Sequence, residues 1–282
     1  MVRSWLYVPG NRPDRFDKAA SSGADAVIID LEDAVPERSK DVARETVAEW
    51  LRGRTEDDTQ IWVRVNTGKR GIEDVSAVTV AGLRGVCLPK VESSVELGAV
   101  DDLLSLSEAK QGFTEGKWVL SPLIESARGM TMLRMIVVGP RVHQVQLGAV
   151  DLAADLGLEV HSGCDDLLVI RSLLVMECAA ARLAPPVAPV SIDFQDLEKF
   201  HESTRSFKAG GFMGRACIHP NQVAVANTVF TPSESEVAQA QDMIHRLTLA
   251  LETGDGVVLD QFGQLVDEAT VRSARRVLSL VR

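Results

Sequence analysis

The four cysteines of this 282-residue chain are widely spaced, and no two of them form a Cys-x-x-Cys motif. Disulfide frameworks and cysteine-based zinc sites both need cysteines at short or repeated spacings. The sequence therefore argues against either kind of site. We expect reduced, mostly buried thiols at Cys87, Cys164, Cys178 and Cys217.

A surplus of positive charge is also missing, since 30 Lys and Arg residues stand against 40 Asp and Glu, which gives a formal net charge of -10. Binding to nucleic-acid phosphates or to an anionic membrane surface requires clustered basic side chains. The chain has no apolar run of membrane-spanning length and no signal-peptide pattern after Met1. We therefore expect a cytoplasmic protein with no nucleic-acid partner and no membrane partner.

The glycine-rich turn of dinucleotide-binding folds is absent as well, because Gly10-Asn11-Arg12-Pro13 follows the first apolar run instead of Gly-x-Gly-x-x-Gly. This argues against an open doubly wound sheet. What the chain has is a series of short apolar runs that alternate with helical patterns. The eight runs are residues 5–8, 26–29, 61–65, 86–88, 118–120, 145–147, 189–192 and 215–218. Eight parallel strands with covering helices predict an α/β fold, a (β/α)8 TIM barrel.

The predicted barrel occupies residues 1–230 as a single catalytic domain. Beyond Thr231-Pro232 the pattern changes to a helix, a glycine-punctuated hairpin and a final Arg-rich helix. These elements predict a C-terminal helix-hairpin-helix extension over residues 231–282. Because so small a unit buries little apolar surface, we expect it to dock on its own barrel or on a neighbour's.

Polar side chains follow the apolar runs at the positions where barrel enzymes place their active sites. Glu125 and Asp151 end neighbouring runs, and two carboxylates with retained waters and substrate oxygens suit Mg²⁺. The alternative is a pair of rim carboxylates held by hydrogen bonds. Asp30, Glu32 and Asp33 follow the second run and are predicted to accept hydrogen bonds from waters held by the metal, although Asp33 could also cap a helix.

Arg64 lies inside an otherwise apolar run, on the face that alternation assigns to Trp62 and Asn66. A charged side chain there needs a partner. It could pair with an acidic neighbour, or it could grip a substrate carboxylate and stabilise oxyanion charge. We favour the second role because an acid cluster with a metal would form a natural anion-binding site.

Several ordered motifs resemble those of the citrate lyase β-subunit-like family, the HpcH/HpaI aldolase superfamily that includes malyl-CoA and citramalyl-CoA lyases. The segments that carry the resemblance are residues 6–16, 23–35, 62–66, 88–92, 122–129, 148–157 and 216–223. The resemblance implies a barrel, a homotrimer, magnesium at Glu125 and Asp151, and a substrate gripped by Arg64. It also implies that Asp267, in a segment similar to the family's C-terminal one, is a catalytic residue carried into an adjacent subunit's site. Without the family, Asp267 is an N-cap of the last helix.

The resulting hypothesis is a magnesium-dependent carbon-carbon lyase that cleaves or forms a carboxylated β-hydroxyacyl-CoA, with a short acyl-CoA and a 2-oxo acid as its partners. Arg12 and Lys18 are candidates for contacts with the CoA phosphates, and for both the alternative is a solvated surface position. Three other functions stay open. They are the β subunit of a citrate lyase acting on citryl groups of an acyl carrier protein, a malyl-CoA-type thioesterase, and a non-catalytic binding subunit.

Overall fold

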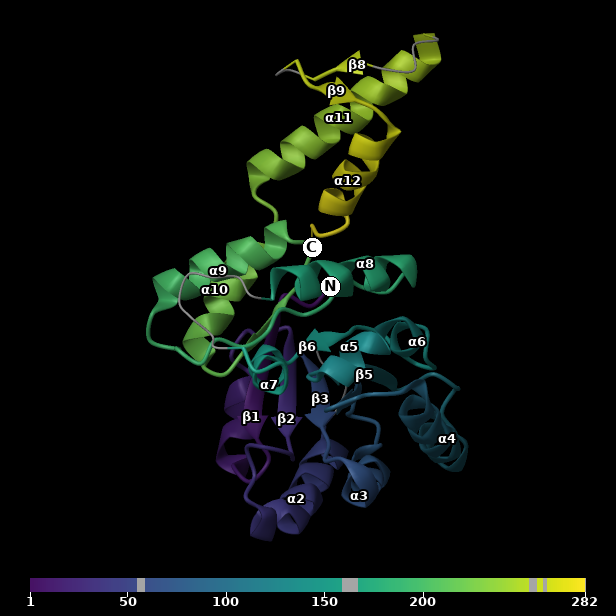
Figure 1. The fold of residues 1–282 in the computed structure, drawn as a ribbon, viewed down its shortest axis with the longest axis vertical. Helices are drawn as coiled ribbons and strands as arrows, with labels where there is room; N and C mark the ends of the chain where they lie inside the picture. Colours follow the sequence, from purple (N-terminus) through teal and green to yellow (C-terminus); the bar gives the residue numbers. More distant parts are fainter. Residues whose placement is uncertain (55–58, 159–166, 254–257, 261–262, 282) are drawn as a thin grey trace. The chain divides into compact units, whose positions relative to one another are not determined.

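The structure is a computed structural model that describes residues 1–282 except 55–58, 159–166, 254–257, 261–262 and 282 (Figure 1). Cys164 lies outside the described residues. The chain forms two compact units, Val2–Asn227 and Thr228–Arg282, and the second also contains Met1. None of the helices that the structure describes has both the length and the low polarity needed to cross a membrane.

The larger unit is built on a curled sheet of seven parallel strands in the order β6-β5-β4-β3-β2-β1-β7. The strands are β1 (Ser4–Pro9), β2 (Ala26–Asp30), β3 (Gln60–Arg64), β4 (Gly85–Leu88), β5 (Val119–Ile124), β6 (Gln146–Leu147) and β7 (Arg215–Cys217). Short 3-10 helices at Pro13–Arg15 and Glu37–Ser39 precede the first two α-helices. The α-helices are α1 (Phe16–Ala20), α2 (Lys40–Arg52), α3 (Gly68–Val78), α4 (Ser94–Gln111), α5 (Ala127–Thr131), α6 (Leu133–Val137), α7 (Ala149–Asp155), α8 (Leu168–Ala180), α9 (Leu197–Ala209) and α10 (Pro220–Phe230). Seven of the eight predicted strands are therefore confirmed, with β5 longer than expected.

The prediction of a strand at residues 189–192 is wrong. Two isolated bridges stand just before it instead, from Val187 to Gln146 of β6 and from Ala188 to Arg215 of β7. Prolines at positions 185, 186 and 189 flank these two residues. Because proline has no N–H to donate, it cannot extend a hydrogen-bonded ladder, and the segment stays irregular.

Alternate side chains of the strands enter two different cores. One set, which includes Trp5, Ile28 and Trp62, packs together inside the curl with other strand residues. The other set, which includes Val27 and Val63, packs against residues of α2, α3 and α4 on the outside. Strand residues two apart share a face, so each strand delivers its last inward-facing side chain to the same end of the sheet. This end carries the site described below.

The smaller unit contains α11 (Glu234–Thr253), the antiparallel strands β8 (Val258–Leu259) and β9 (Leu265–Val266), and α12 (Glu268–Leu278). Its hydrophobic cluster is formed by the buried residues Leu247, Val266 and Val271, which come from α11, β9 and α12 respectively. Val258 of β8 packs against them, while Leu259 and Leu265 are exposed. A core of this size is small, in keeping with the limited apolar area of the segment.

Candidate functional site

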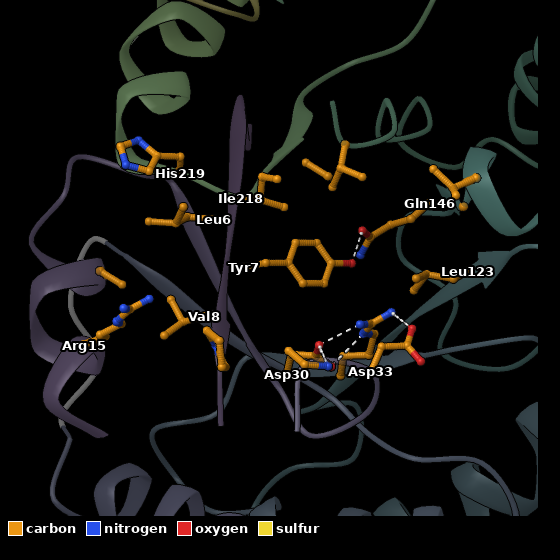
Figure 2. Close-up of a pocket in the computed structure, with 18 of the residues that line it drawn as sticks. Leu6, Tyr7, Val8, Arg15, Asp30, Asp33, Leu123, Gln146, Ile218 and His219 are labelled. Atoms are coloured by element: carbon orange, nitrogen blue, oxygen red, sulfur yellow. Dashed lines mark hydrogen bonds and ion pairs between the residues drawn. The ribbon is translucent and has the colours of Figure 1, made fainter. Parts of the chain in front are cut away.

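A cavity of about 950 Å³ lies at the carboxyl ends of the strands in the larger unit (Figure 2). Its wall is formed by residues of β1, β2, β3, β5 and β6 and by the segments that follow β6 and β7. The sequence-predicted residues that line it are Arg12, Lys18, Asp30, Asp33, Arg64, Glu125 and Asp151. The cavity therefore brings together predicted residues that are up to 139 positions apart in the chain, from Arg12 to Asp151.

Arg64 and Asp30 occupy opposite positions on the neighbouring strands β3 and β2. The guanidinium donates from Nε to Oδ1 of Asp30 over 2.7 Å and from Nη2 to Oδ2 over 2.6 Å. The same carboxylate accepts the backbone N–H groups of Glu32 and Ala34. Burial disfavours the charge of Arg64, but the hydrogen bonds and the charge of Asp30 outweigh it and raise the arginine's pKa. The strand register thus holds Arg64 in one orientation.

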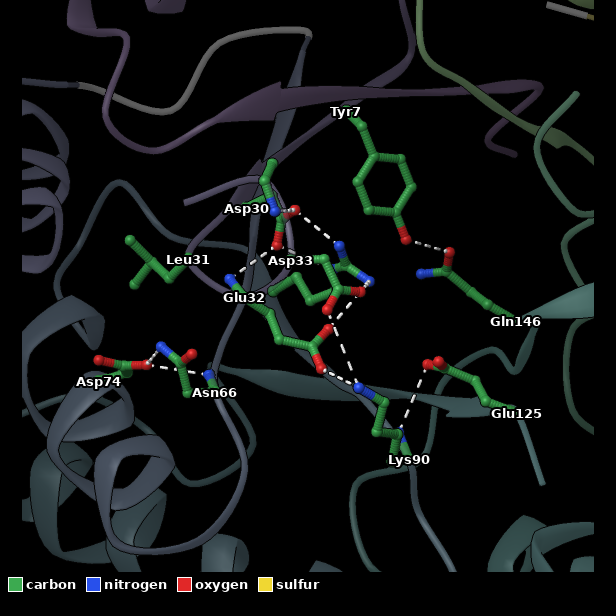
Figure 3. Close-up of polar contacts among 12 residues, drawn as sticks. Tyr7, Asp30, Leu31, Glu32, Asp33, Asn66, Asp74, Lys90, Glu125 and Gln146 are labelled. Carbon is green, nitrogen blue, oxygen red and sulfur yellow. Dashed lines mark hydrogen bonds and ion pairs between the residues drawn. The ribbon is translucent and has the colours of Figure 1, made fainter. Parts of the chain in front are cut away.

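Glu32 is buried beside this pair and contacts two cations (Figure 3). Its Oε1 accepts a 2.8 Å hydrogen bond from Nζ of Lys90. Its Oε2 lies 3.0 Å from Nη1 of Arg64, but the geometry is not that of a hydrogen bond, so this oxygen has no donor among the described residues. Burial raises the pKa of Glu32, although Lys90 and Arg64 oppose the shift. Asp33 is more exposed and makes a 3.3 Å contact with Arg64.

The segment after β2 that carries these acids is held by Lys40, a residue that the sequence alone did not single out. Its Nζ donates to the backbone oxygens of Leu31 and Glu32 over 3.1 and 2.7 Å, and to the side-chain oxygen of Asn66. Asn66 is in turn fixed by Asp74 of α3. One ammonium group therefore ties the acid-bearing segment to the end of β3.

Glu125 follows β5 and is only 3% exposed. Its one hydrogen bond in the described structure is a 3.4 Å contact from the backbone N–H of Lys90, whose φ of 53° lies in the left-handed region. Burial, with help from the charges of Glu32 and Asp151, raises the pKa of Glu125 to about 7 against the opposing effect of Arg64. A carboxylate in these surroundings is costly to ionise unless a further cation joins it.

Gly148 gives the side chain of Glu125 the space that it occupies. A Cβ at this glycine would lie 2.4 Å from Cγ of Glu125 and 2.9 Å from its Cδ. The N–H of Gly148 also donates to the backbone of Ile124, which places the start of α7 next to the end of β5. Asp151, in the first turn of α7, is thereby brought to the same cavity as Glu125.

The acids of the site outnumber their cationic partners. The acid cluster consists of Asp30, Glu32, Asp33, Glu125 and Asp151. The cations that act on it are Arg64 and Lys90. No group of three or more His, Cys, Asp or Glu side chains among the described residues is arranged to hold a metal alone. A hard divalent cation fits this donor set if it keeps waters or ligand oxygens in its remaining positions. The donor set of the cluster therefore suits a hard divalent cation that takes few protein ligands.

Arg12 and Lys18 line the cavity near its rim and are exposed. Arg12 donates to both carboxylate oxygens of Asp14, over 2.9 and 2.8 Å. Arg15 lies at the same rim. The rim therefore carries exposed positive charge while the floor is acidic.

Two residues of the floor were missed by the sequence analysis. The hydroxyl of Tyr7 donates to Oε1 of Gln146 over 3.2 Å, and the Tyr7 ring lies 5.4 Å from the guanidinium carbon of Arg64 (Figures 2 and 3). Burial raises the pKa of Tyr7 well above its usual value, so the hydroxyl keeps its proton. The detectable signal was a polar side chain inside an apolar strand, at Gln146 between Val145 and Leu147.

Asp267 belongs to the smaller unit and caps α12. Its side chain accepts from the N–H of Thr270 over 2.8 Å, and the Thr270 hydroxyl is 2.9 Å from the N–H of Asp267. These bonds lower the pKa of the Asp267 carboxyl. The capping role anticipated as the alternative is therefore present.

Comparisons with known proteins agree on one family. A model of the HpcH/HpaI aldolase/citrate lyase family matches residues 3–220. The citrate lyase subunit beta of Leuconostoc mesenteroides subsp. cremoris is 31% identical over 99% of this chain and 92% of its own length. The L-malyl-CoA/beta-methylmalyl-CoA lyase of Cereibacter sphaeroides is 31% identical over 98% and 93%.

Among solved structures, protein CitE from Mycobacterium tuberculosis in complex with magnesium, acetoacetate and coenzyme A is similar with a TM-score of 0.76 and 28% identity. That likeness covers 98% of this chain and 96% of the CitE chain. The family model, the relatives and the fold all cover the segment that carries the cavity. The chain belongs to the HpcH/HpaI aldolase/citrate lyase family.

Proposed function

We propose that this chain is a magnesium-dependent carbon-carbon lyase on a TIM-barrel-like fold, in which the bridged residues Val187 and Ala188 stand in place of the eighth strand. It cleaves or forms a carboxylated β-hydroxyacyl-CoA. The products of cleavage are a short acyl-CoA and a 2-oxo acid. The observation that carries the proposal is the buried Glu125, with a pKa raised to about 7, beside Asp151 and opposite Arg64 in one cavity. The names of the lyase relatives and the ligands of the CitE complex support the same reaction.

Glu125 and Asp151 are the proposed magnesium ligands. When bound, magnesium supplies positive charge next to the substrate oxygens and offsets the surplus of carboxylates. The unpaired Oε2 of Glu32 is suited to accept from a water on the ion, and Asp30 and Asp33 keep Arg64 beside it. The residues present therefore fit the metal that the relatives' complexes contain.

Arg64 is proposed to stabilise the reacting oxygen. Cleavage breaks the bond between the hydroxyl-bearing carbon and the α-carbon of the thioester. The hydroxyl loses its proton and becomes the carbonyl of the 2-oxo acid, while the electron pair of the broken bond goes to the α-carbon, which gains a proton. No oxidant is needed. Because Asp30 holds Arg64 by two hydrogen bonds, its charge is oriented before the substrate arrives.

Asp267 is the proposed group that exchanges the proton with the α-carbon, within the site of a neighbouring subunit of a homotrimer. The smaller unit, residues 231–282 in the sequence-based division, would then complete a neighbour's cavity. Arg12 and Lys18 at the rim are proposed to contact the CoA phosphates, for which exposed cations are suited. Light scattering on the purified protein tests the trimer directly.

The decisive experiment has two parts. Calorimetry measures magnesium binding in the presence of pyruvate for the wild type, Glu125→Gln and Asp151→Asn, with the exposed helical Asp102→Asn as control. We expect tight binding only in the wild type and the control. A screen of malyl-, citramalyl- and citryl-CoA then follows 2-oxo-acid release. Free CoA without a 2-oxo acid would identify a thioesterase, and activity only on an acyl carrier protein would identify a citrate lyase subunit.

A further inference from the structure

Tyr7 and Gln146 are polar residues of the cavity wall that the proposed reaction does not use. Both lie on the inner face of the curled sheet, and both line the cavity. Gln146 pairs in register with Leu123, which is two residues before Glu125 on the same face of β5. The layer formed by Tyr7 and Gln146 therefore lies one step deeper in the sheet than the acid cluster. A substrate held at Glu125 and Arg64 would point its innermost group at this layer.

The hydrogen bonds of this layer leave acceptors facing the cavity. Nε2 of Gln146 donates to Oγ of the fully buried Ser121 over 3.1 Å and to Sγ of Cys87 over 3.3 Å. Both amide protons are thus used within the wall, and Oε1 is the end of the amide that points at Tyr7. The Tyr7 proton is used by Oε1 of Gln146. The oxygens that remain can accept a hydrogen bond, but they have no proton left to offer.

We propose that Tyr7 and Gln146 determine the substrate class: the site takes a 2-oxo acid with a single carboxylate and a small apolar or hydrogen-donating substituent, and it rejects one with a second carboxylate. This inference rests on the proposed function and narrows it. A second carboxylate would place its oxygens, which only accept hydrogen bonds, against the acceptor oxygens of Tyr7 and Gln146. The layer is buried, so the unsatisfied carboxylate would weaken the binding affinity of the acid. Glyoxylate and pyruvate meet the requirement, and oxaloacetate does not.

The test measures binding of pyruvate, glyoxylate and oxaloacetate by calorimetry with magnesium present, and KM for each acid with acetyl-CoA in the condensation direction. We expect oxaloacetate to bind about 10- to 100-fold more weakly than pyruvate, the range that one buried unpaired group produces. Gln146→Met removes the acceptor and frees the Tyr7 proton to point into the cavity. In that variant we expect the preference for pyruvate to shrink by about tenfold. Adding Tyr7→Phe removes that proton and should restore the preference.

Gln144→Met is the matched control. Gln144 is equally buried and lies two residues before Gln146, but its amide donates to the backbone oxygens of Pro185 and Met213, and it does not line the cavity. Its replacement should change stability and leave the ratio of affinities alone. Two results would overturn the inference and leave the lyase proposal standing. One is equal affinity of the wild type for pyruvate and oxaloacetate. The other is a ratio of pyruvate affinity to oxaloacetate affinity that is the same in Gln146→Met as in the Gln144→Met control. Failure of all three acids to bind would overturn both.

Discussion

Replacing Gly148 with alanine should damage magnesium binding without damaging the fold. The added methyl group would lie 2.4 Å from Cγ of Glu125, about 1 Å inside ordinary carbon-carbon contact. The backbone at Gly148 has a φ of -90°, which alanine adopts without strain, so the effect is confined to the neighbouring carboxylate. Misplacement by about 1 Å costs a functional site on the order of 100-fold. We expect magnesium affinity to fall by about 10- to 100-fold, which corresponds to about 1.4 to 2.8 kcal/mol.

Calorimetry with magnesium and pyruvate measures the effect, and urea unfolding checks the fold. The control is Gly98→Ala in α4, where a Cβ would meet no atom within 4 Å. It should bind magnesium as the wild type does and gain up to about 1 kcal/mol in stability, because glycine is unfavourable inside helices. If Gly148→Ala folds normally and binds magnesium with unchanged affinity, then either the position of Glu125 does not depend on the space beside Gly148 or Glu125 is not a metal ligand.

Three further outcomes are expected. Burial, aided by Arg84, lowers the pKa of His143 beside the Trp62 ring, so below about pH 6.5 this histidine binds a proton more readily in the unfolded chain than in the folded one. Because the raised pKa of Glu125 acts in the opposite direction between pH 7 and pH 5, the His143 contribution is measured as a difference: the stability of the wild type relative to His143→Gln should fall from pH 7 to pH 5, and a constant difference in urea unfolding would contradict this. Asp267→Asn should suppress cleavage with little loss of stability, because Asn caps helices as well as Asp does, whereas Asp267→Ala should also lower the free energy of unfolding by about 1 kcal/mol. Full activity in Asp267→Asn would show that the carboxylate takes no part in the reaction. Lys40→Met should raise KM for 2-oxo acids and speed proteolysis after β2, since three oxygens lose their shared donor; unchanged kinetics would make Lys40 irrelevant to the site.

The seven confirmed strands could be recognised from the sequence because each is a short apolar run between turn residues. The candidate acids followed from the same pattern, since parallel strands deliver their ends to one edge of a sheet. The wrong strand at residues 189–192 shows the limit of this reasoning. Its composition was apolar enough, but Pro189 removes a donor that the ladder requires.

The residues that were missed depend on contacts between distant parts of the chain. Tyr7 and Gln146 are 139 positions apart, and only the curl of the sheet brings the hydroxyl to the amide. Gly148 is informative only once Glu125 is seen to occupy the space beside it. Lys40 stands in a helix whose pattern gives no hint that its ammonium group reaches back to Leu31. Side-chain contacts of this kind have no local sequence signature.

The segment at Val187 and Ala188 joins β6 to β7 by one isolated bridge on each side, whereas the other neighbouring strands are joined by continuous hydrogen-bonded pairing. Amide hydrogens there should exchange with solvent faster than those of β1 to β5, because fewer bonds must break for the segment to open. Ala188 and Val190 also line the cavity. Local opening of this segment would therefore widen the cavity between β6 and β7. The strand β3, which carries Arg64, lies on the opposite side of the sheet and would stay in place.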